Sequence, residues 1–520
     1  MNRREFVASS AALAAAPVNA APAAPGLSMN EDSSHYFFTR AGQKLDAAKV
    51  ASWVDQYAGT QVRELILNPN AQRTSYDSKV RDPIWRGYDP DGPDDQPLLA
   101  SLTPEGRKGA RKWIHTAWQL AHDGIDVYKV WIARAREKRL SPWISMRMND
   151  LHNVDDERCY IHNEFWRSHP QFRRVPYRGD RWIDRALDYA HPEVREHNMA
   201  LVRELAERYD FDGLELDWMR FGYHFRPGQE AQGAVILTRF TRDVRRLLDQ
   251  WEKKRKHRIR LAARVPSRPR TAEGLGMDGV RWAHEGLIDM LVITPFWATL
   301  EFDMPIEEWK QLLAGTKVTL AAGLELLIRP YSQYSKPSIF NSLETVRGAA
   351  ASLLDRGADR IYLFNYMDSD TAIPELATYP TLLGEVGSLQ TIADKHRRHV
   401  ITYADTWAPG EPVARNGLPA QCVPKRWHEF RIPTGPKPAS SQVTAVLGIE
   451  GAKEDIGAWD LRVNGEPCAF TGEVTAQQSK PSYPLYGFRV PPAAMNRGYN
   501  LIEVQPKSAG TIHWVEISIG

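Results

Sequence analysis

The stretch from Phe211 to Phe221 reads FDGLELDWMRF and constrains the fold more than any other part of the chain. It is an extended run between two helix-like segments, which is typical of a strand in a parallel α/β fold. Side chains alternate along a strand, so one face carries Leu214, Leu216 and Trp218, and the other carries Gly213, Glu215 and Asp217. In a (β/α)8 barrel the leucine face meets the helices and the carboxylate face points inward. Asp217 would then lie at the C-terminal end of the barrel, where the active sites of such barrels are found.

Seven more segments with strand character alternate with helix-like segments along the chain. They span residues 62–70, 124–127, 140–150, 258–266, 288–297, 317–327 and 360–368, and 124–127 is poorly marked. Eight strands separated by helices predict an α/β fold of the (β/α)8 TIM barrel type, which we place at residues 30–387. Residues 71–104 and 151–191 form connections longer than the usual few residues, which indicates functional loops.

The pattern changes at about residue 388, where helical periodicity stops. Short extended segments bounded by Pro, Gly and Asn follow, at residues 427–432, 442–447, 459–463, 486–490, 499–505 and 511–519. Such spacing predicts an antiparallel, jelly-roll-like β-sandwich over residues 388–520. Asn464 and Gly465 predict a tight hairpin turn within it. A module of this kind can bind carbohydrate or brace the barrel.

The N-terminus has the pattern of an export signal. Residues 2–7 read NRREFV and resemble a twin-arginine signal, an Ala-rich apolar stretch follows, and residues 18–20 offer an A-x-A-like cleavage site. We therefore expect a signal peptide at residues 1–24 and a periplasmic or secreted protein. The apolar stretch is too short to span a membrane, and no later run qualifies.

Composition narrows the function classes. The charges of the 67 basic and 64 acidic residues nearly balance, and the net charge of +3 does not indicate that the protein binds nucleic acid. The three cysteines have no metal-ligand spacing and do not indicate a disulfide framework; a Cys422–Cys468 pair within the C-terminal module is allowed by the sequence but is not predicted. No Gly-rich phosphate loop, G-x-S-x-G elbow or H-E-x-x-H motif occurs, which argues against phosphoryl transfer, α/β-hydrolase and zincin chemistry. We predict no metal and no cofactor.

The run DGLELDWMR at residues 212–220 carries a family resemblance. It is similar to the fourth-strand signature of chitinase-type barrels of glycoside hydrolase family 18. It also resembles the D-G-x-x-x-D-x-x-R run of the bacterial glycosyl-hydrolase-like, "family 10-like" barrel proteins, which Asp212, Gly213, Asp217 and Arg220 match. The chitinase-type catalytic Glu is replaced here by Met219, so substrate-assisted hexosaminidase chemistry is not expected. The resemblance covers roughly residues 35–385 and implies glycosidic bond cleavage.

Glycoside hydrolysis commonly requires two carboxyl groups that flank the scissile bond, one protonated and one ionised. Candidates at predicted strand ends are Asp217, Glu325 and Asp150, with Glu215 deeper in the barrel. The fourth and seventh strands lie across a barrel from each other, so Asp217 and Glu325 can face each other over a sugar. Asp217, beside several polar and cationic side chains, suits the nucleophile or base. Glu325, in the apolar run AAGLELL, suits the acid, and the two roles can be exchanged.

Structural roles for these carboxyl groups compete with catalytic ones. Glu215 lies low in the barrel, where neighbouring strands offer Arg147, Arg260 and Arg264 as partners, so we interpret it as a structural acid. Glu325 fits either interpretation equally, as an acid catalyst or as a buried acid paired with an arginine.

Polar and aromatic residues near the predicted strand ends are candidates for substrate binding. They are Asn68, Asn70, Arg147, Asn149, His152, Trp218, Arg220, Tyr223, His224, Arg264, Trp297, Asn365 and Tyr366. The insertion at 151–191 adds a group of arginines, which are surface residues or contacts for an acidic glycan: Arg158, Arg167, Arg173, Arg174, Arg178 and Arg181. Its histidines His152, His162 and His169 are too irregularly spaced to predict a metal cluster.

Together these patterns predict an exported glycoside hydrolase that cleaves a polysaccharide or oligosaccharide, neutral or acidic, with a carboxylate pair. The alternative is a non-catalytic secreted glycan-binding protein that keeps the barrel cleft without an effective acid. Barrels host many chemistries, so the site must decide between the two. The oligomeric state stays open.

Overall fold

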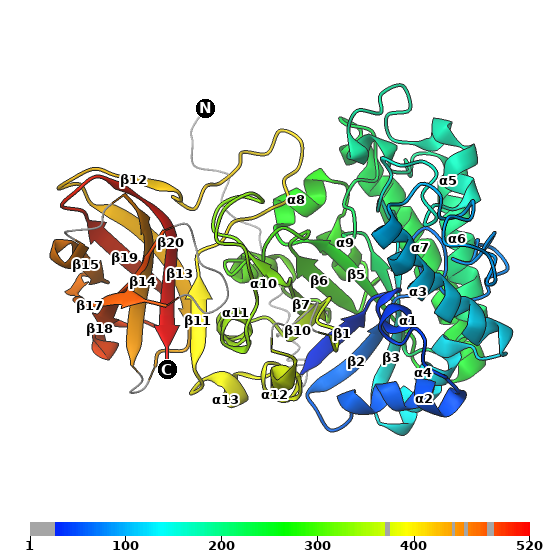
Figure 1. The fold of residues 1–520 in the computed structure, drawn as a ribbon, viewed down its shortest axis with the longest axis horizontal. Helices are drawn as coiled ribbons and strands as arrows, with labels where there is room; N and C mark the ends of the chain where they lie inside the picture. The colour runs from blue at the N-terminus through cyan, green and yellow to red at the C-terminus, as the bar shows by residue number, and fades with distance from the viewer. Residues whose placement is uncertain (1–25, 370–374, 439–441, 452–455, 476–482) are drawn as a thin grey trace, which may run out of the picture.

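The computed structural model describes residues 26–369, 375–438, 442–451, 456–475 and 483–520. The expected signal peptide at residues 1–24 lies outside this range. Figure 1 shows a barrel of strands surrounded by helices, with an all-β part beside it. No helix in the described residues is long and apolar enough to cross a membrane.

Among the described residues, eight parallel strands close into a barrel, which confirms the predicted fold class. The sheet closes because the first strand pairs with both the second and the last. The strands are β1 Leu27–Glu31, β2 Val62–Leu67, β3 Ser141–Arg147, β4 Gly213–Asp217, β5 Arg260–Pro266, β6 Met290–Thr294, β7 Thr319–Leu324 and β10 Arg360–Phe364. A two-stranded sheet, β8 Leu327–Ile328 with β9 Ile339–Phe340, extends the loop after β7.

The prediction was wrong at the first two strands. The barrel begins with β1, which the sequence pattern did not reveal, and the predicted second strand at 124–127 is a turn that leads into a helix. Polar Ser28 and Asn30 face the barrel interior next to Glu64 and Ile66, so β1 shows little apolar character. At 124–127, the carboxylate of Asp126 accepts the amide of Lys129 and starts the helix there. One strand was missed and one was predicted where there is none, so the third to eighth predicted strands keep their places in the order around the barrel.

Helices cover the outside of the barrel (Figure 1). They are α1 His35–Thr39, α2 Ala47–Ser52, α3 Pro104–His122, α4 Val127–Glu137, α5 Glu164–Ser168, α6 Pro192–Arg208, α7 Glu230–Arg255, α8 Pro269–Gly274, α9 Gly279–His284, α10 Ile306–Leu312, α11 Leu343–Asp355, α12 Tyr379–Glu385 and α13 Leu389–Ile392. Local signals set their starts: Thr103 caps α3 before a proline, and Ser342 and Thr345 form a capping box for α11.

The predicted alternation along β4 is present. Leu214 and Leu216 join the large core between sheet and helices, while Glu215 points into the barrel. A separate interior cluster fills the barrel axis, formed by Ile66, Trp143, Ala262, Met290, Val292, Ala321, Tyr362 and Phe364. Gly213 is required on this face, because a Cβ there would lie 2.2 Å from the Trp143 ring.

The C-terminal part forms two antiparallel sheets, as predicted. One sheet runs in the order β11-β20-β14-β18-β17 with β12 beside β20, and the other in the order β13-β19-β15-β16. The strands are β11 Arg397–Val400, β12 Ala420–Cys422, β13 His428–Gly435, β14 Val443–Glu450, β15 Asp460–Val463, β16 Glu466–Pro467, β17 Ala469–Val474, β18 Leu485–Val490, β19 Gly498–Gln505 and β20 Gly510–Ile519. Asn464 and Gly465, with φ of 53° and 84°, make the predicted turn between β15 and β16.

The two parts pack directly on each other. β11 runs against α11 so closely that a Cβ at Gly348 would lie 2.0 Å from the carbonyl oxygen of Arg398. From β11 the chain turns back over the barrel as the gold segment near α8 in Figure 1, which we call the return segment, residues 401–419. Cys422 and Cys468 are both free thiols, so the pairing allowed by the sequence does not form.

Candidate active site

A two-lobed cleft opens at the C-terminal ends of the barrel strands. One lobe, of about 610 Å³, is walled by aromatic side chains. The other, of about 420 Å³, is lined by Asp32, His35 and Arg147 among others. His152, Asn153, Arg220 and Asn365 line both, so the two hollows form one cleft. We call them the aromatic lobe and the charged lobe.

Glu325 lies in the wall of the aromatic lobe, directly after β7. Burial raises the pKa of its carboxyl to about 8, although the nearby Arg264 and Arg220 oppose the rise. Its Oε1 is 3.7 Å from Arg264 Nη2. The backbone is held in place because Tyr366 donates its hydroxyl to the Glu325 carbonyl at 2.9 Å. The carboxyl of Glu325 therefore favours its protonated form at neutral pH, and the residue is one of those that line the aromatic lobe.

Asp217 ends β4 but lies beneath the cleft, outside the lining of either lobe. Both of its oxygens are 3.2 Å from Arg264 Nη1. Its Oδ1 also accepts the amides of Met219 and Arg220, at 3.1 and 2.8 Å. The expected pair across the barrel is thus bridged by a guanidinium, since Arg264 approaches Asp217 and Glu325 together. The contacts of Asp217 fix Arg264 and the turn that brings Arg220 into the cleft.

Asp150 is a buried support for the cleft. It accepts hydrogen bonds from the amide of His152 and from Arg147 Nη1, at 3.0 and 3.2 Å. Burial favours its neutral form, but His152 and Arg147 hold the pKa of the carboxyl well below its usual range. His152 Nδ1 faces this carboxylate at 2.9 Å, and its Nε2 lies 2.8 Å from Arg220 Nη2. Because arginine only donates, Nε2 accepts and the ring proton sits on Nδ1.

Asp32 is a cleft carboxylate that the sequence analysis did not predict. It follows β1 and lines the charged lobe, where it forms an ion pair with Arg147 and accepts the amide and hydroxyl of Ser34 at 2.8 and 2.6 Å. Burial alone would raise its pKa, yet Arg147 and Arg220 hold the pKa of Asp32 well below its usual range. The signal that marks it is an acid at a strand end, and it was lost because β1 itself was not recognised.

Glu215 lies inside the barrel, below the cleft. Its Oε1 accepts hydrogen bonds from the hydroxyls of Ser145 and Tyr362, at 2.7 and 2.8 Å, rather than from the arginine that the sequence led us to expect. Burial and the neighbouring Asp217 raise the pKa of Glu215 to about 7. Its contacts make it part of the barrel core.

Aromatic rings from three separate loops form the wall of the aromatic lobe. Trp182, from the insertion after β3, stacks on Phe296 at 6.2 Å, with 15° between the ring planes. Phe221, after β4, meets Phe296 edge-on at 5.5 Å, and Tyr223 meets Trp182 in the same way at 5.8 Å. Trp297 remains 41% exposed at the rim. Flat, partly exposed rings of this kind suit stacking on the apolar faces of sugars.

The structure sorts the predicted substrate-binding residues into two groups. His152, Arg220, Tyr223, Trp297 and Asn365 line the cleft, and Arg147 lines its charged lobe. The others are buried and line neither lobe: Asn68, Asn70, Asn149, Trp218, His224, Arg264 and Tyr366.

Most of the buried group has internal hydrogen bonds. Asn149, for example, donates to the carbonyls of Leu187 and Tyr223, both at 2.9 Å. His224 donates to the carbonyl of Trp218 at 2.9 Å, and burial lowers the pKa of His224 to about 3. These side chains position the loops around the cleft.

The insertion arginines Arg158, Arg167, Arg173, Arg174, Arg178 and Arg181 line neither lobe. Arg173 pairs with Glu157, and Arg178 pairs with Asp184. These two serve to hold the insertion together. Within the described ranges, no group of three or more His, Cys, Asp or Glu side chains is arranged to hold a metal ion.

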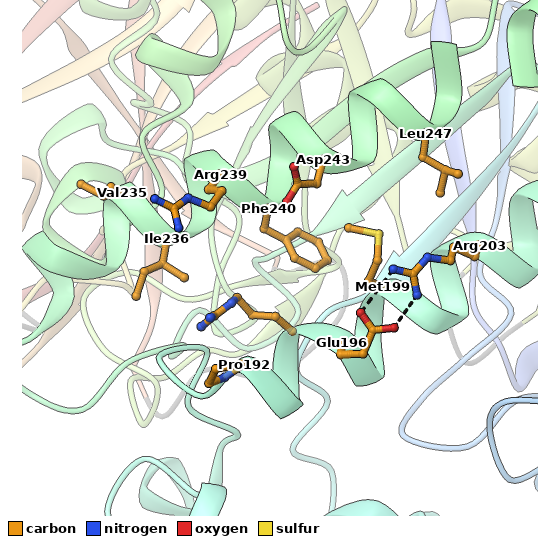
Figure 2. A pocket seen from close by; sticks show the side chains of 11 residues that line it. Pro192, Glu196, Met199, Arg203, Val235, Ile236, Arg239, Phe240, Asp243 and Leu247 are labelled. Atoms are coloured by element: carbon orange, nitrogen blue, oxygen red, sulfur yellow. Dashed lines mark hydrogen bonds and ion pairs between the residues drawn. The ribbon is translucent and has the colours of Figure 1, made fainter. Parts of the chain in front are cut away.

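A hollow of about 400 Å³ also lies outside the barrel, between α6 and α7 (Figure 2). Figure 2 shows Glu196 and Arg203 joined in an ion pair beside Met199 and Phe240. The hollow is built from helix side chains and receives none of the strand-end residues. The predicted strand-end residues that line a hollow are thus found in the cleft at the barrel mouth and not between these helices.

No model of a known protein family matches the chain, and no curated protein matches it. Solved structures with similar folds include alpha-L-fucosidase isoenzyme 2 from Paenibacillus thiaminolyticus, at 11% identity and a TM-score of 0.41, over 70% of this chain and 49% of that one. Chitinase ChiW from Paenibacillus sp. str. FPU-7 has 13% identity and a TM-score of 0.38, over 94% and 52%.

The PgaB (BpsB) glycoside hydrolase domain from Bordetella bronchiseptica has 11% identity and a TM-score of 0.39, over 70% of this chain and 99% of that one. This chain spans about half the length of the fucosidase and of the chitinase. At such identities and TM-scores these similarities assign no activity to this chain. The resemblance to the family 10-like barrel proteins remains an expectation carried by residues 212–220.

Proposed function

We propose that this protein is an exported glycoside hydrolase that cleaves glycosidic bonds of a polysaccharide or oligosaccharide in the barrel-mouth cleft. The observation that carries the proposal is Glu325, a carboxyl group that is protonated at neutral pH and lines an aromatic-walled cleft. Asp32 supplies an ionised carboxylate in the adjoining lobe. Carboxyl groups in opposite protonation states are what acid-assisted glycoside cleavage uses.

In the proposed mechanism, Glu325 donates its proton to the glycosidic oxygen as the bond to the anomeric carbon breaks. Asp32 either takes a proton from the water that attacks this carbon or attacks it directly; in the second case water, deprotonated by Glu325, then breaks the Asp32–glycosyl bond and restores both carboxyl groups. Arg220, between the lobes, binds substrate oxygens, and Trp297 stacks on a sugar ring. Asp217 and Asp150 act as positioning residues, through Arg264 and His152 respectively.

Product release from a panel of neutral and acidic polysaccharides tests the proposal. The wild type should release new reducing ends. Glu325→Gln should lose at least about 100-fold in kcat, because it removes general acid catalysis, while it still binds the glycan. Glu301→Gln is the matched control: Glu301 is another buried glutamate with a raised pKa, but it lies outside the cleft.

An aryl glycoside with an activated leaving group separates the acid role from general damage. Such a leaving group needs no protonation, so the defect of Glu325→Gln should largely disappear on it, whereas the defect of Asp32→Asn should persist. Full activity of Glu325→Gln on the natural glycan would exclude the assignment. Glycan binding without cleavage by any variant, wild type included, would favour the non-catalytic glycan-binding alternative.

A further inference from the structure

The return segment reaches from the β-sandwich to the rim of the cleft and is anchored to the barrel there. The amide of Phe302 donates to Thr402 Oγ1 at 3.2 Å, and Asn416 Nδ2 donates to the carbonyl of Pro330 at 2.6 Å. On α8, the hydroxyl of Thr271 donates to Glu411 at 2.8 Å. The segment is therefore a fixed part of the barrel mouth rather than a free linker.

One side chain of this segment engages the wall of the aromatic lobe. The carboxylate of Asp405 accepts three successive backbone amides, from Phe296 at 2.8 Å, Trp297 at 2.9 Å and Ala298 at 2.8 Å. Three consecutive N–H groups that converge on one carboxylate form an anion-binding turn, and charged acceptors make the stronger hydrogen bonds. Asp405 lies more than 100 residues away in the chain from the turn that it holds.

The turn that Asp405 holds carries Phe296 and Trp297, two of the aromatic side chains of the aromatic lobe. Phe296 closes the stack with Trp182, and Trp297 presents its face at the rim with 41% of its surface exposed. Arg329 supports the turn from the other side, because its Nη1 donates to the carbonyl of Ala298 at 2.9 Å. The turn is thus held from both sides, and on the side of its amides the support comes from the return segment.

We propose that Asp405 is a positioning residue of the binding site, which fixes the turn at 296–298 so that Trp297 forms a preorganised platform for a sugar ring. This inference rests on the proposed glycan-cleaving function and deepens it. The return segment, which leads out of the β-sandwich, then supports the substrate site and does more than brace the barrel. A preorganised wall lowers the cost of ordering on binding, so the effect of Asp405 falls on substrate affinity.

The first test needs no substrate. Hydrogen–deuterium exchange of the peptide that covers residues 295–300 should speed up by about tenfold or more in Asp405→Ala, since three charge-assisted hydrogen bonds are lost. Asp405→Asn keeps an oxygen acceptor without the charge and should give a smaller increase. Glu411→Gln is the matched control, because Glu411 anchors the same segment on α8 and does not contact the turn. Unchanged exchange in both Asp405 variants would overturn the inference.

The second test measures how the turn affects the substrate. In Asp405→Ala, measured on the acidic side of the alkaline limb where Glu325 stays protonated in both proteins, we expect KM for an oligosaccharide to rise about tenfold with kcat within about twofold, because the lost contacts order the binding wall. Trp297→Ala should raise KM similarly, and the double variant should be no worse than either single one, since both act through the same platform. Additive effects would overturn the platform role. A third outcome is that the Asp405 variants exchange faster but the wild type neither binds nor cleaves any glycan. That outcome would refute the proposed function, while the contact between Asp405 and the turn would be confirmed.

Discussion

At the scale of single residues, Arg264 is the charged side chain that lies close to the carboxyl groups of both Asp217 and Glu325. It is fully buried, with Asp217 at 3.2 Å and Glu325 at 3.7 Å. One guanidinium that lies against Asp217 cannot fully compensate a second buried charge, so the interior favours the neutral form of Glu325. The raised pKa of Glu325 therefore comes from burial, which Arg264 offsets only in part.

This raised pKa predicts the pH dependence of the proposed reaction. Because Glu325 must be protonated to act, kcat/KM should hold steady near neutral pH and fall as the pH rises through about 8. The charged groups around it are Arg264 from β5, Arg220 after β4 and Asp405 from the return segment. Since Asp405 raises the pKa of Glu325, Asp405→Asn should move this alkaline limb to lower pH. A pH–rate profile of both proteins checks this, and a wild-type profile that stays flat through about pH 9 would contradict it.

At the scale of secondary-structure elements, β4 connects the packed core with the residues of the proposed site. Its leucines pack on the helices, its carboxylates point into the barrel, and its end is tied by Asp217 to the turn that bears Arg220. At its other end β4 approaches β3 closely, where Gly213 lies opposite Trp143.

Gly213→Ala tests this close approach. A Cβ at this position would lie 2.2 Å from the Trp143 ring, so overpacking should lower the free energy of unfolding by about 1–3 kcal/mol. Urea unfolding measures the change. The double variant Gly213→Ala with Trp143→Leu should lose less than the sum of the two single variants, because the smaller side chain makes room for the methyl group. Full additivity would show that the two positions do not meet.

At the scale of the whole molecule, the barrel and the sandwich form one structure around the cleft. The sandwich packs on α11 through β11, and the chain then returns over the barrel mouth to Asp405. The contact on α11 thus sets where the return segment starts. The cleft has walls from the insertion after β3 and from the loops after β4, β6 and β7, and the return segment supports the loop after β6 from behind.

Gly348→Ala tests the contact between the two parts. A Cβ at Gly348 would lie 2.0 Å from the backbone of Arg398, so we expect a loss of about 1–3 kcal/mol in unfolding free energy. Gly384 is the matched control: it also lies in a helix, and a Cβ there would meet no neighbouring atom within 4 Å. Gly384→Ala should be neutral or stabilise by up to about 1 kcal/mol. Equal thermal stability of the two variants would contradict the close packing of β11 on α11.

The success of prediction from sequence depended on how strong each local pattern was. Strands with an apolar face towards the helices, such as β4 and β7, stand out from alternation alone. β1 does not stand out, because Ser28 and Asn30 point into the barrel and interrupt its apolar character. The prediction instead counted residues 124–127 as a strand, although the helix that Asp126 caps begins there. Among the carboxyl groups of the proposed site, the sequence pointed to Glu325 because it directly follows a clearly patterned strand, whereas it did not point to Asp32 because β1 was not recognised.

By itself, the sequence determined the alternation of strands and helices, the barrel followed by a sandwich, and the inward face of β4, because these depend on periodicity within a few residues. Only the tertiary structure decided which polar strand-end residues reach the cleft. Trp218 and His224 turn into the core, while Trp182, Phe296 and Asp405 meet at the rim from distant segments. The physical reason is that burial, charge pairing and loop contacts depend on neighbours in space, which no local pattern records.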